Sequence, residues 1–302
     1  MSSRKQSRIT NIWSKVIKDG SGNICTKVVV EATSAFEYRV SRRGNDVILK
    51  AAGVAANMPE GTIEVNDGLV RKVSLIQTSA GEAVFEIHPE HPCEYRVEAA
   101  EGIPFRTAII LNWAFLIKMF KGKKLVIDPG HGGDDWGGKG PVSLIEKNVV
   151  LLIARAVEDL FGQVGIQTVA TRAADENISA DSRFELAKNE KADLFIGIHT
   201  YSDNNSKVGG AAVRYKPSCK DSLLVAGMIK EELIQKLKVA DRGLKESREL
   251  AVPGEIPGVE VEVVTITNWV EEGLLRSPTI HKKAAEGIFN GVRKYFANIG
   301  GH

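Results

Sequence analysis

Two histidines and one glutamate in the second half of the chain have the residue types of a catalytic metal site. His131 follows the apolar segment LVID inside a glycine-rich loop, His199 ends the segment DLFIGIH, and Glu146 stands where a helix is expected to begin. Two imidazoles and a carboxylate can hold a zinc ion and leave its fourth position to water. Such a metal would activate the water as a nucleophile. The pattern leaves open the alternative that each histidine is a hydrogen-bonded structural residue.

The elements expected around these residues bring them to one edge of a sheet. From Lys124 the sequence alternates between strand and helix patterns. Strands are predicted at 125–128, 167–171, 193–199, 210–215 and 259–266, and helices at 146–161, 181–189, 222–238 and after the N-cap Ser277. Such alternation is typical of an α/β fold with a mainly parallel sheet flanked by helices. In these sheets the site lies at the carboxyl ends of the strands.

The loop around His131 contains more glycine than a turn requires. We therefore expect that a bulky group approaches its backbone closely, and that the glycines keep this space open. The glycines concerned are Gly130, Gly132, Gly133, Gly137 and Gly138.

The first hundred residues predict a separate all-β unit. Apolar or alternating segments at 26–32, 36–40, 46–51, 61–65, 70–78, 83–88 and 93–97 are separated by turn residues. The sequence EYRV occurs at 37–40 and again at 94–97, each time after an apolar strand. This doubled unit favours a small β-sandwich. We expect the β domain at 7–105, a connector that includes a buried strand at 106–121, and the α/β domain at 122–300.

Composition narrows the classes of function. The 302 residues are 43% hydrophobic and 26% charged, as in a globular protein, and the net charge of +2 gives no electrostatic argument for a nucleic-acid partner. Three cysteines without CxxC spacing imply no disulfide framework. The apolar run at 107–120 is interrupted by Asn112 and Lys118 and is shorter than the roughly 20 residues that span a bilayer, so no integral membrane segment is predicted. The N-terminal residues show no signal-peptide pattern.

From about Lys123 to the C terminus, the sequence resembles the zinc-dependent N-acetylmuramoyl-L-alanine amidases of the amidase_3 type, which are bacterial cell-wall hydrolases. The matching elements are VIDPGHGG at 126–133, Glu146-Lys147, Thr171-Arg172 with Asp175, Arg183, ADLFIGIH ending at His199, Gly210, PGVEVEVVTITN at 257–268 and the final helix around SPTIHKKAAEGIF. The preceding β region more loosely resembles the AMIN domain, which is associated with envelope targeting and cell-wall binding.

The resemblance implies a role for each candidate residue. His131, Glu146 and His199 would be the zinc ligands. Glu262 would be the catalytic glutamate, which takes a proton from water and delivers it to the leaving amine. The strand pattern alone indicates something less specific, because Glu260 and Glu262 lie on one face of an alternating strand that solvent would cover.

Other matching residues are expected to support the site, with a direct substrate role for Arg172, Asp175 or Arg183 as the alternative. Asp128, just before the loop, would fix the turn or orient a ligand from behind. Arg172 is expected to form a structural pair with Asp175, and Arg183 has a similar supporting role.

The sequence departs from the family pattern at three places. After the catalytic glutamate the family usually has Leu-Gly-Phe, whereas this chain has Val263-Val264-Thr265, and the β-branched Val264 is expected to narrow the approach to the backbone near the substrate. After the second histidine the family often has Ala-Asn, whereas this chain has Thr200-Tyr201. The segment between His199 and Gly210 is too short for the inhibitory helix that some relatives insert there.

The implied reaction is zinc-dependent hydrolysis of the amide between N-acetylmuramic acid and L-alanine of the peptidoglycan stem peptide. Peptidoglycan is then the expected partner, together with activating envelope proteins, and the expected location is the cell envelope or the extracellular space. The lack of a signal pattern suggests a mature or trimmed form, and action inside a spore-forming compartment is the alternative. Two other functions stay open: a zinc peptidase on the related fold, and a catalytically degenerate cell-wall-binding protein.

Overall fold

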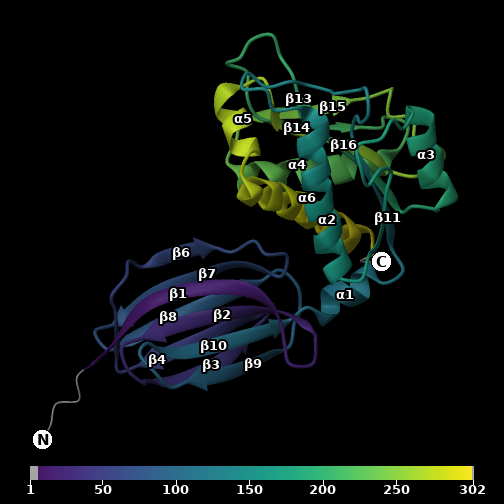
Figure 1. Ribbon diagram of the computed structural model, residues 1–302. Helices are drawn as coiled ribbons and strands as arrows, with labels where there is room; N and C mark the ends of the chain where they lie inside the picture. The colour runs from purple at the N-terminus through teal and green to yellow at the C-terminus, as the bar shows by residue number, and fades with distance from the viewer. Residues whose placement is uncertain (1–5, 301–302) are drawn as a thin grey trace, which may run out of the picture. The chain divides into compact units, whose positions relative to one another are not determined.

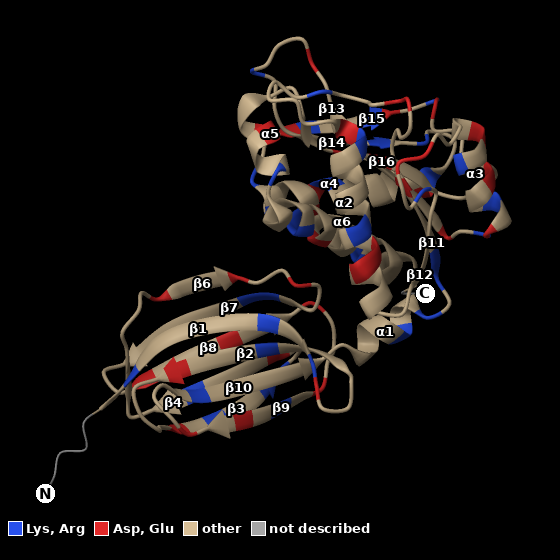
Figure 2. Cartoon of the chain, in the orientation of Figure 1, with Lys and Arg blue, Asp and Glu red and all other residues tan. Residues whose placement is uncertain are grey.

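The computed structural model describes residues 6–300, and the chain divides into two compact units between Lys118 and Met119 (Figure 1). The first unit is built of strands and the second of strands and helices. This confirms the predicted fold class, an α/β domain preceded by a small all-β domain. Among the described residues, no helix has the length and apolar character needed to cross a membrane. Basic and acidic side chains are mixed over both units (Figure 2).

The first unit consists of two five-stranded sheets. One has the order β5-β1-β2-β10-β9 and the other β3-β4-β8-β7-β6. The strands are β1 (Ser7–Lys18), β2 (Ile24–Ala32), β3 (Glu37–Arg43), β4 (Asp46–Ala52), β5 (Val54–Ala56), β6 (Gly61–Glu64), β7 (Val70–Ser79), β8 (Glu82–Pro89), β9 (Tyr95–Ala100) and β10 (Phe105–Asn112). Alternating side chains of both sheets, such as Val28 and Phe85, are fully buried, as expected when two sheets face each other.

The EYRV repeat has a structural counterpart in this unit. Its two copies form β3 and β9, which are edge strands of opposite sheets. In the chain, β3 follows β2, and β9 follows β8, which are the central strands of the two sheets. Each copy then forms an antiparallel hairpin with the next strand, β3 with β4 and β9 with β10. The strand β10 pairs with β2 as β4 pairs with β8. The unit therefore contains two similar four-strand segments, β1 to β4 and β7 to β10. In each segment the first two strands belong to one sheet and the last two to the other.

The segment 106–121, expected to connect the domains, is mostly regular structure. Its apolar run forms the buried strand that was expected there, β10, but this strand belongs to the first sheet because it pairs with both β2 and β9. The helix α1 (Ala114–Phe120) follows and spans the division between the units. Trp113, between them, donates from Nε1 to Thr26 Oγ1 at 3.0 Å and fixes the end of β10 to β2.

The second unit contains a six-stranded sheet with the order β12-β11-β13-β16-β14-β15. Four neighbouring pairs are parallel, and only β14 and β16 are antiparallel. The strands are β11 (Lys124–Pro129), β12 (Gln167–Ala170), β13 (Leu194–Tyr201), β14 (Ala211–Tyr215), β15 (Asp241–Glu246) and β16 (Gly258–Thr265). All except β15 were predicted from the sequence, and β15 was missed because DRGLKE has no apolar alternation.

Helices cover the two faces of this sheet. The helices are α2 (Glu146–Gln163), α3 (Ala180–Asn189), α4 (Lys220–Leu237), α5 (Trp269–Leu275) and α6 (Pro278–Ile299). On one face α2 packs against β11 and β13, α4 packs against β14 and β16, and α6 packs on both helices. On the other face, Val126 and Phe195 form a cluster with Ala187 of α3 and with Leu250. The site lies at the edge where β11 and β13 both end.

Candidate metal centre

The structure brings His131, Glu146 and His199 together. Glu146 Oε1 lies 3.4 Å from His131 Nε2 and 3.5 Å from His199 Nδ1, and one ligand atom from each residue lies within 4.8 Å of the others. Zinc bonds of about 2.0–2.1 Å in a tetrahedron place neighbouring ligand atoms about 3.3–3.4 Å apart. The spacing around Glu146 therefore fits a zinc ion, and the donor set suits this metal.

His131 has an unusual backbone conformation. Its φ of +60° lies in the left-handed region, which is uncommon for a residue with a side chain. The strand β11 ends at Pro129, two residues before His131. Arg183 Nη2 donates to the carbonyl oxygen of His131 at 2.8 Å. Residues in this region persist where the surroundings hold them, and such positions occur preferentially at functional sites.

The glycines of the loop make room for the ligands themselves. A Cβ atom on Gly130 would overlap the His199 ring, and one on Gly137 would lie 2.5 Å from His131 Cδ2 and 2.8 Å from Glu146 Oε2. We expected the glycines to keep space for an approaching bulky group. At these two positions the approaching groups are side chains of the protein, so alanine would displace the ligand set.

The carboxylate of Glu146 is fixed by backbone donors. The backbone N–H of Thr200 donates to Oε1 and that of Gly138 to Oε2, both at 2.7 Å. Only 3% of the residue is exposed. Burial by itself would raise the pKa of Glu146, but its hydrogen bonds to the two histidines outweigh burial and hold the pKa well below its usual range. The site therefore presents an ionised carboxylate.

The pKa values of the two imidazoles are raised when no metal is bound. Burial by itself would lower the pKa of His199, but the hydrogen bond to Glu146 and the nearby carboxylates of Glu260 and Asp128 raise it to about 9. For His131, burial is likewise outweighed by Glu146, and the pKa is raised. A metal ion would have to replace these protons, because histidine binds metals in its neutral form.

Asp135 contacts His131 at Nδ1, the ring nitrogen that does not face Glu146. Its Oδ2 atom lies 2.8 Å from His131 Nδ1. A proton on Nδ1 that is bonded to this carboxylate leaves Nε2, on the side of Glu146, as the nitrogen that can bind a metal in the neutral imidazole, and such partners fix the tautomer of metal-binding histidines. Sequence reasoning missed Asp135, although a carboxylate four residues after a candidate ligand in the same loop could have indicated it.

Asp128 and Arg172 make their hydrogen bonds to the loop and its neighbours, and not to the imidazoles. Asp128 is buried, and it accepts from Thr171 Oγ1 and, at 2.6 Å, from Arg183 Nη1. Arg172 donates to the carbonyl oxygens of Pro129, Gly130 and Lys147 at 2.8–2.9 Å. These contacts tie the end of β11 to β12, α2 and α3.

The expected pairing of Arg172 with Asp175 is not formed. Asp175 instead accepts from Lys147 Nζ at 2.7 Å and from the backbone N–H of Gly133 at 2.8 Å. The guanidinium of Arg172 is already used by carbonyl oxygens, which explains why the carboxylate turns to the lysine. Lys147, next to the candidate ligand Glu146, is thus a supporting residue whose partner could not be identified from the sequence.

Glu262 lies on β16, beside the strand that carries His199. On β16 it is in register with His199 of the parallel neighbour β13, and only 3% of it is exposed. Its carboxylate contacts two guanidinium groups, Arg242 Nη2 at Oε2 and Arg214 Nη1 at Oε1, the latter at 3.5 Å. The expectation of a solvated strand face is therefore wrong for Glu262. Sequence reasoning missed both arginines.

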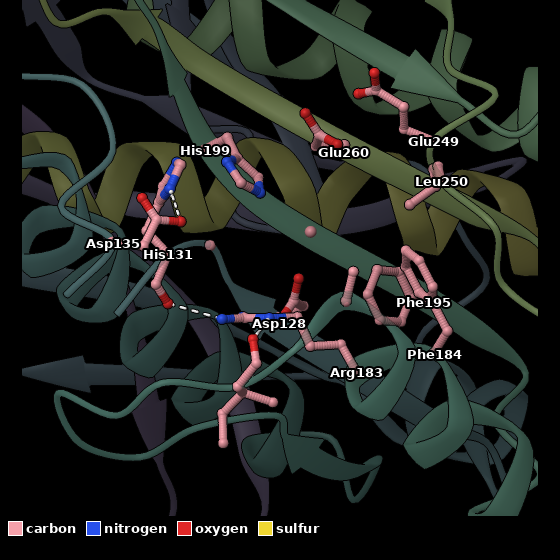
Figure 3. Close-up of a pocket in the computed structure, with 14 residues that line it drawn as sticks. Asp128, His131, Asp135, Arg183, Phe184, Phe195, His199, Glu249, Leu250 and Glu260 are labelled. Atoms are coloured by element: carbon pink, nitrogen blue, oxygen red, sulfur yellow. Dashed lines mark hydrogen bonds and ion pairs between the residues drawn. The ribbon is translucent and has the colours of Figure 1, made fainter. Parts of the chain in front are cut away.

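Glu260 lines a cavity that adjoins the two histidines. Asp128, Gly197 and Glu260 are in register on three neighbouring strands, and Gly197 leaves space between the two carboxylates. The cavity has a volume of about 250 Å³, with the histidines at one end and two phenylalanines at the other (Figure 3). Its walls include Asp128, His131, Phe184, Phe195, His199 and Glu260. Glu260 therefore faces the site, with 23% of its side chain exposed.

Comparisons with known proteins agree with this arrangement. Residues 125–294 match the Amidase_3 family, described as N-acetylmuramoyl-L-alanine amidase. The germination-specific N-acetylmuramoyl-L-alanine amidase of Bacillus subtilis is 30% identical over 195 residues, which cover 59% of this chain and 82% of that protein. The solved structure of the N-acetylmuramoyl-L-alanine amidase AmiC2 of Nostoc punctiforme is 32% identical with a TM-score of 0.54, covering 58% of this chain and 97% of that one.

A further solved relative was determined with a partner. The CwlD amidase of Clostridioides difficile, in complex with the GerS lipoprotein, is 27% identical with a TM-score of 0.56, and the match covers 59% of this chain and all of that one. The family match spans more than half of the chain and contains every candidate ligand. The chain therefore belongs to the Amidase_3 family of N-acetylmuramoyl-L-alanine amidases, hydrolases that act on the peptidoglycan of the bacterial cell wall.

Proposed function

We propose that this amidase is zinc-dependent and cleaves the amide between N-acetylmuramic acid and L-alanine of the stem peptide. The observation that carries the proposal is the cluster of His131, Glu146 and His199, in which Glu146 Oε1 lies 3.4 Å and 3.5 Å from the two imidazole nitrogens, the spacing of neighbouring ligands around tetrahedral zinc. When bound there, zinc supplies a Lewis acid that polarises the scissile carbonyl and makes water a better nucleophile.

The residues of the chain then have separate tasks. His131, Glu146 and His199 hold the metal, and Asp135 keeps His131 in the tautomer that binds it. Glu262 accepts the proton of the attacking water on a carboxylate oxygen and donates it to the leaving nitrogen of L-alanine. Three observations support Glu262: its register with His199, its burial, and its place in the family pattern.

Glu260 is the second candidate for the proton-transfer role. Its support is geometric, because it lines the cavity that both histidines also line. The two glutamates are separated by one residue on β16, so substitution of each in turn distinguishes them.

The departures after Glu262 are accommodated inside the fold. Val264 is fully buried, and Thr265 is held by its backbone N–H, which donates to Glu271 Oε2 at 2.7 Å. Neither side chain lines the cavity beside the histidines. This supports an active enzyme over the degenerate binding protein.

We further propose that the first unit, as an AMIN-like domain, targets the enzyme to the cell wall, and that the enzyme acts in the envelope or outside the cell. The complex of CwlD with a lipoprotein supports an envelope lipoprotein as an activating partner.

Digestion of purified muropeptides, followed by mass spectrometry, tests the reaction. Intact stem peptides freed from the glycan, only when zinc is supplied, are the expected products. Cleavage within the peptide would favour the zinc peptidase instead. Absence of any release from fully metallated protein would favour the wall-binding protein.

A further inference from the structure

We propose that Arg242 is a positioning residue for Glu262, assisted by Arg214, and that Tyr201 is the platform that holds Arg242 in place. This inference rests on the proposed role of Glu262 in proton transfer. It assigns a function in that step to three residues outside the ligand set.

The carboxylate of Glu262 is held at both oxygens. Arg242, from β15, contacts Oε2, and Arg214, from β14, lies 3.5 Å from Oε1. A buried carboxylate needs such partners, because an unpaired charge in the interior is strongly unfavourable. A carboxylate offers about four acceptor positions, so two arginine contacts leave others for the proton of a water molecule. The pair can therefore fix Glu262 without preventing proton transfer.

Arg242 is itself held from three directions. Its Nε donates to the carbonyl oxygen of Gly210 at 3.2 Å, and its guanidinium carbon lies 3.7 Å from the centre of the Tyr201 ring. Its third contact is Glu262, and its side chain is only 9% exposed. A stacked, hydrogen-bonded guanidinium loses little further freedom when it positions a partner. Arg214 is less constrained, because it also lies 3.8 Å from Glu260 and its side chain is 30% exposed.

Tyr201 links this cluster to the metal ligands. It lies two residues after His199 on β13, where the register with β16 shifts, and its ring lies against Arg242, which contacts Glu262, the register partner of His199. Its hydroxyl donates to Asp203 Oδ2 at 3.0 Å, which fixes the ring beneath Arg242. Position 201 also departs from the family pattern, which often has Ala-Asn where this chain has Thr200-Tyr201. In this chain the aromatic ring thus connects the strand of His199 to the arginine that holds Glu262.

The test is a kinetic double-mutant cycle on the full-length, zinc-loaded protein with a soluble muropeptide as substrate. Arg242→Gln should lower kcat by roughly 10- to 100-fold, the range expected for a small misplacement of a reacting group, and leave KM within about threefold. Bound zinc should stay at the parental level. Arg242→Lys should recover part of kcat. In a Glu262→Gln background, Arg242→Gln should have no further effect, because a positioning residue acts only through the group it positions.

Two pairs of variants separate positioning from folding. Tyr201→Leu removes the platform and should lower kcat, whereas Tyr201→Phe keeps the ring and should retain most of it. Arg155→Gln is the matched control, because Arg155 is an exposed arginine of α2 that donates to the carbonyl oxygen of Ala173. If Arg242→Gln does not fold, the comparison of Tyr201→Leu with Tyr201→Phe still decides.

The outcomes are distinct for the inference and for the proposed function. Equal losses from Arg242→Gln in the parent and in the Glu262→Gln background would overturn the positioning role. A silent Arg242→Gln beside an inactive Glu262→Gln would overturn it too, and would leave the proposed function standing. Parental turnover by Glu262→Gln would instead overturn the proposed role of Glu262, and the inference with it.

Discussion

The affinity for zinc should rise steeply with pH between 7 and 9. In the metal-free protein the pKa of His199 is raised from 6.5 to about 9, because the bond to Glu146 and nearby carboxylates outweigh burial. Zinc needs the neutral imidazole. Roughly 1% of a group with this pKa is neutral at pH 7 and about half at pH 9, so the apparent affinity should increase roughly fiftyfold over this interval.

The stability of the metal-free protein should fall as pH rises from 7 to 9. A histidine whose pKa is raised on folding stabilises the folded state fully below its unfolded value, here 6.5, and this contribution is lost as pH rises toward 9. The difference between the two values corresponds to about 3 kcal/mol. The stabilisation of the protein by zinc should therefore grow across the same interval.

Competition with a chelator of known affinity, at half-unit steps of pH, measures the affinity for zinc. Thermal unfolding with and without zinc, over the same pH range, measures the stability. For the unfolding of the metal-free protein, a Glu146→Gln variant is the control, because its amide cannot hold the histidine protons by charge. An affinity that is independent of pH between 7 and 9 would refute the proposed coupling between the ligand protons and the metal.

Three other predictions concern roles within the chain. Glu262→Gln should reduce turnover roughly 10²- to 10⁴-fold with zinc retained, whereas Glu260→Gln should reduce turnover much less. A larger loss of turnover in Glu260→Gln than in Glu262→Gln would assign the proton-transfer role to Glu260. Asp135→Asn should weaken zinc binding roughly 10-fold in equilibrium dialysis, toward the low end for such partners because its side chain is 64% exposed; unchanged affinity would remove its orienting role. A piece that starts at Met119 should hydrolyse soluble muropeptides, and a piece that ends at Lys118 should pellet with purified cell walls; failure to pellet would argue against targeting.

Strong periodicity explains why much of the fold could be predicted from the sequence. The segment DLFIGIH became the central strand β13, and Ser277-Pro278 began α6 as the N-cap and first helical residue. His131 and His199 met at one edge because β11 and β13 are parallel neighbours, and Glu146 joined them as the first residue of α2. By contrast, β15 was missed because DRGLKE has no apolar alternation, and its stability comes from pairing with β14.

The residues around the ligands were harder to predict, because their partners lie far away in sequence. Arg242 contacts Glu262 across 20 residues, and Asp175 contacts Lys147 across 28. Which charged pair forms depends on the order of strands and on which guanidinium is already used, and neither is encoded in local spacing. The same reason led to the wrong partner for Arg172 and to the interpretation of the buried Glu262 as a solvated residue.

Titration of the metal-free enzyme with zinc, followed by the release of stem peptides from muropeptides, tests the central claim most directly. One metal per chain, held by His131, Glu146 and His199, should make release rise linearly to one equivalent of zinc and then stay constant. His131→Ala and His199→Ala should show no such break at one equivalent. Release by the fully metal-free protein, or a break at another stoichiometry, would contradict a single zinc centre formed by these three residues.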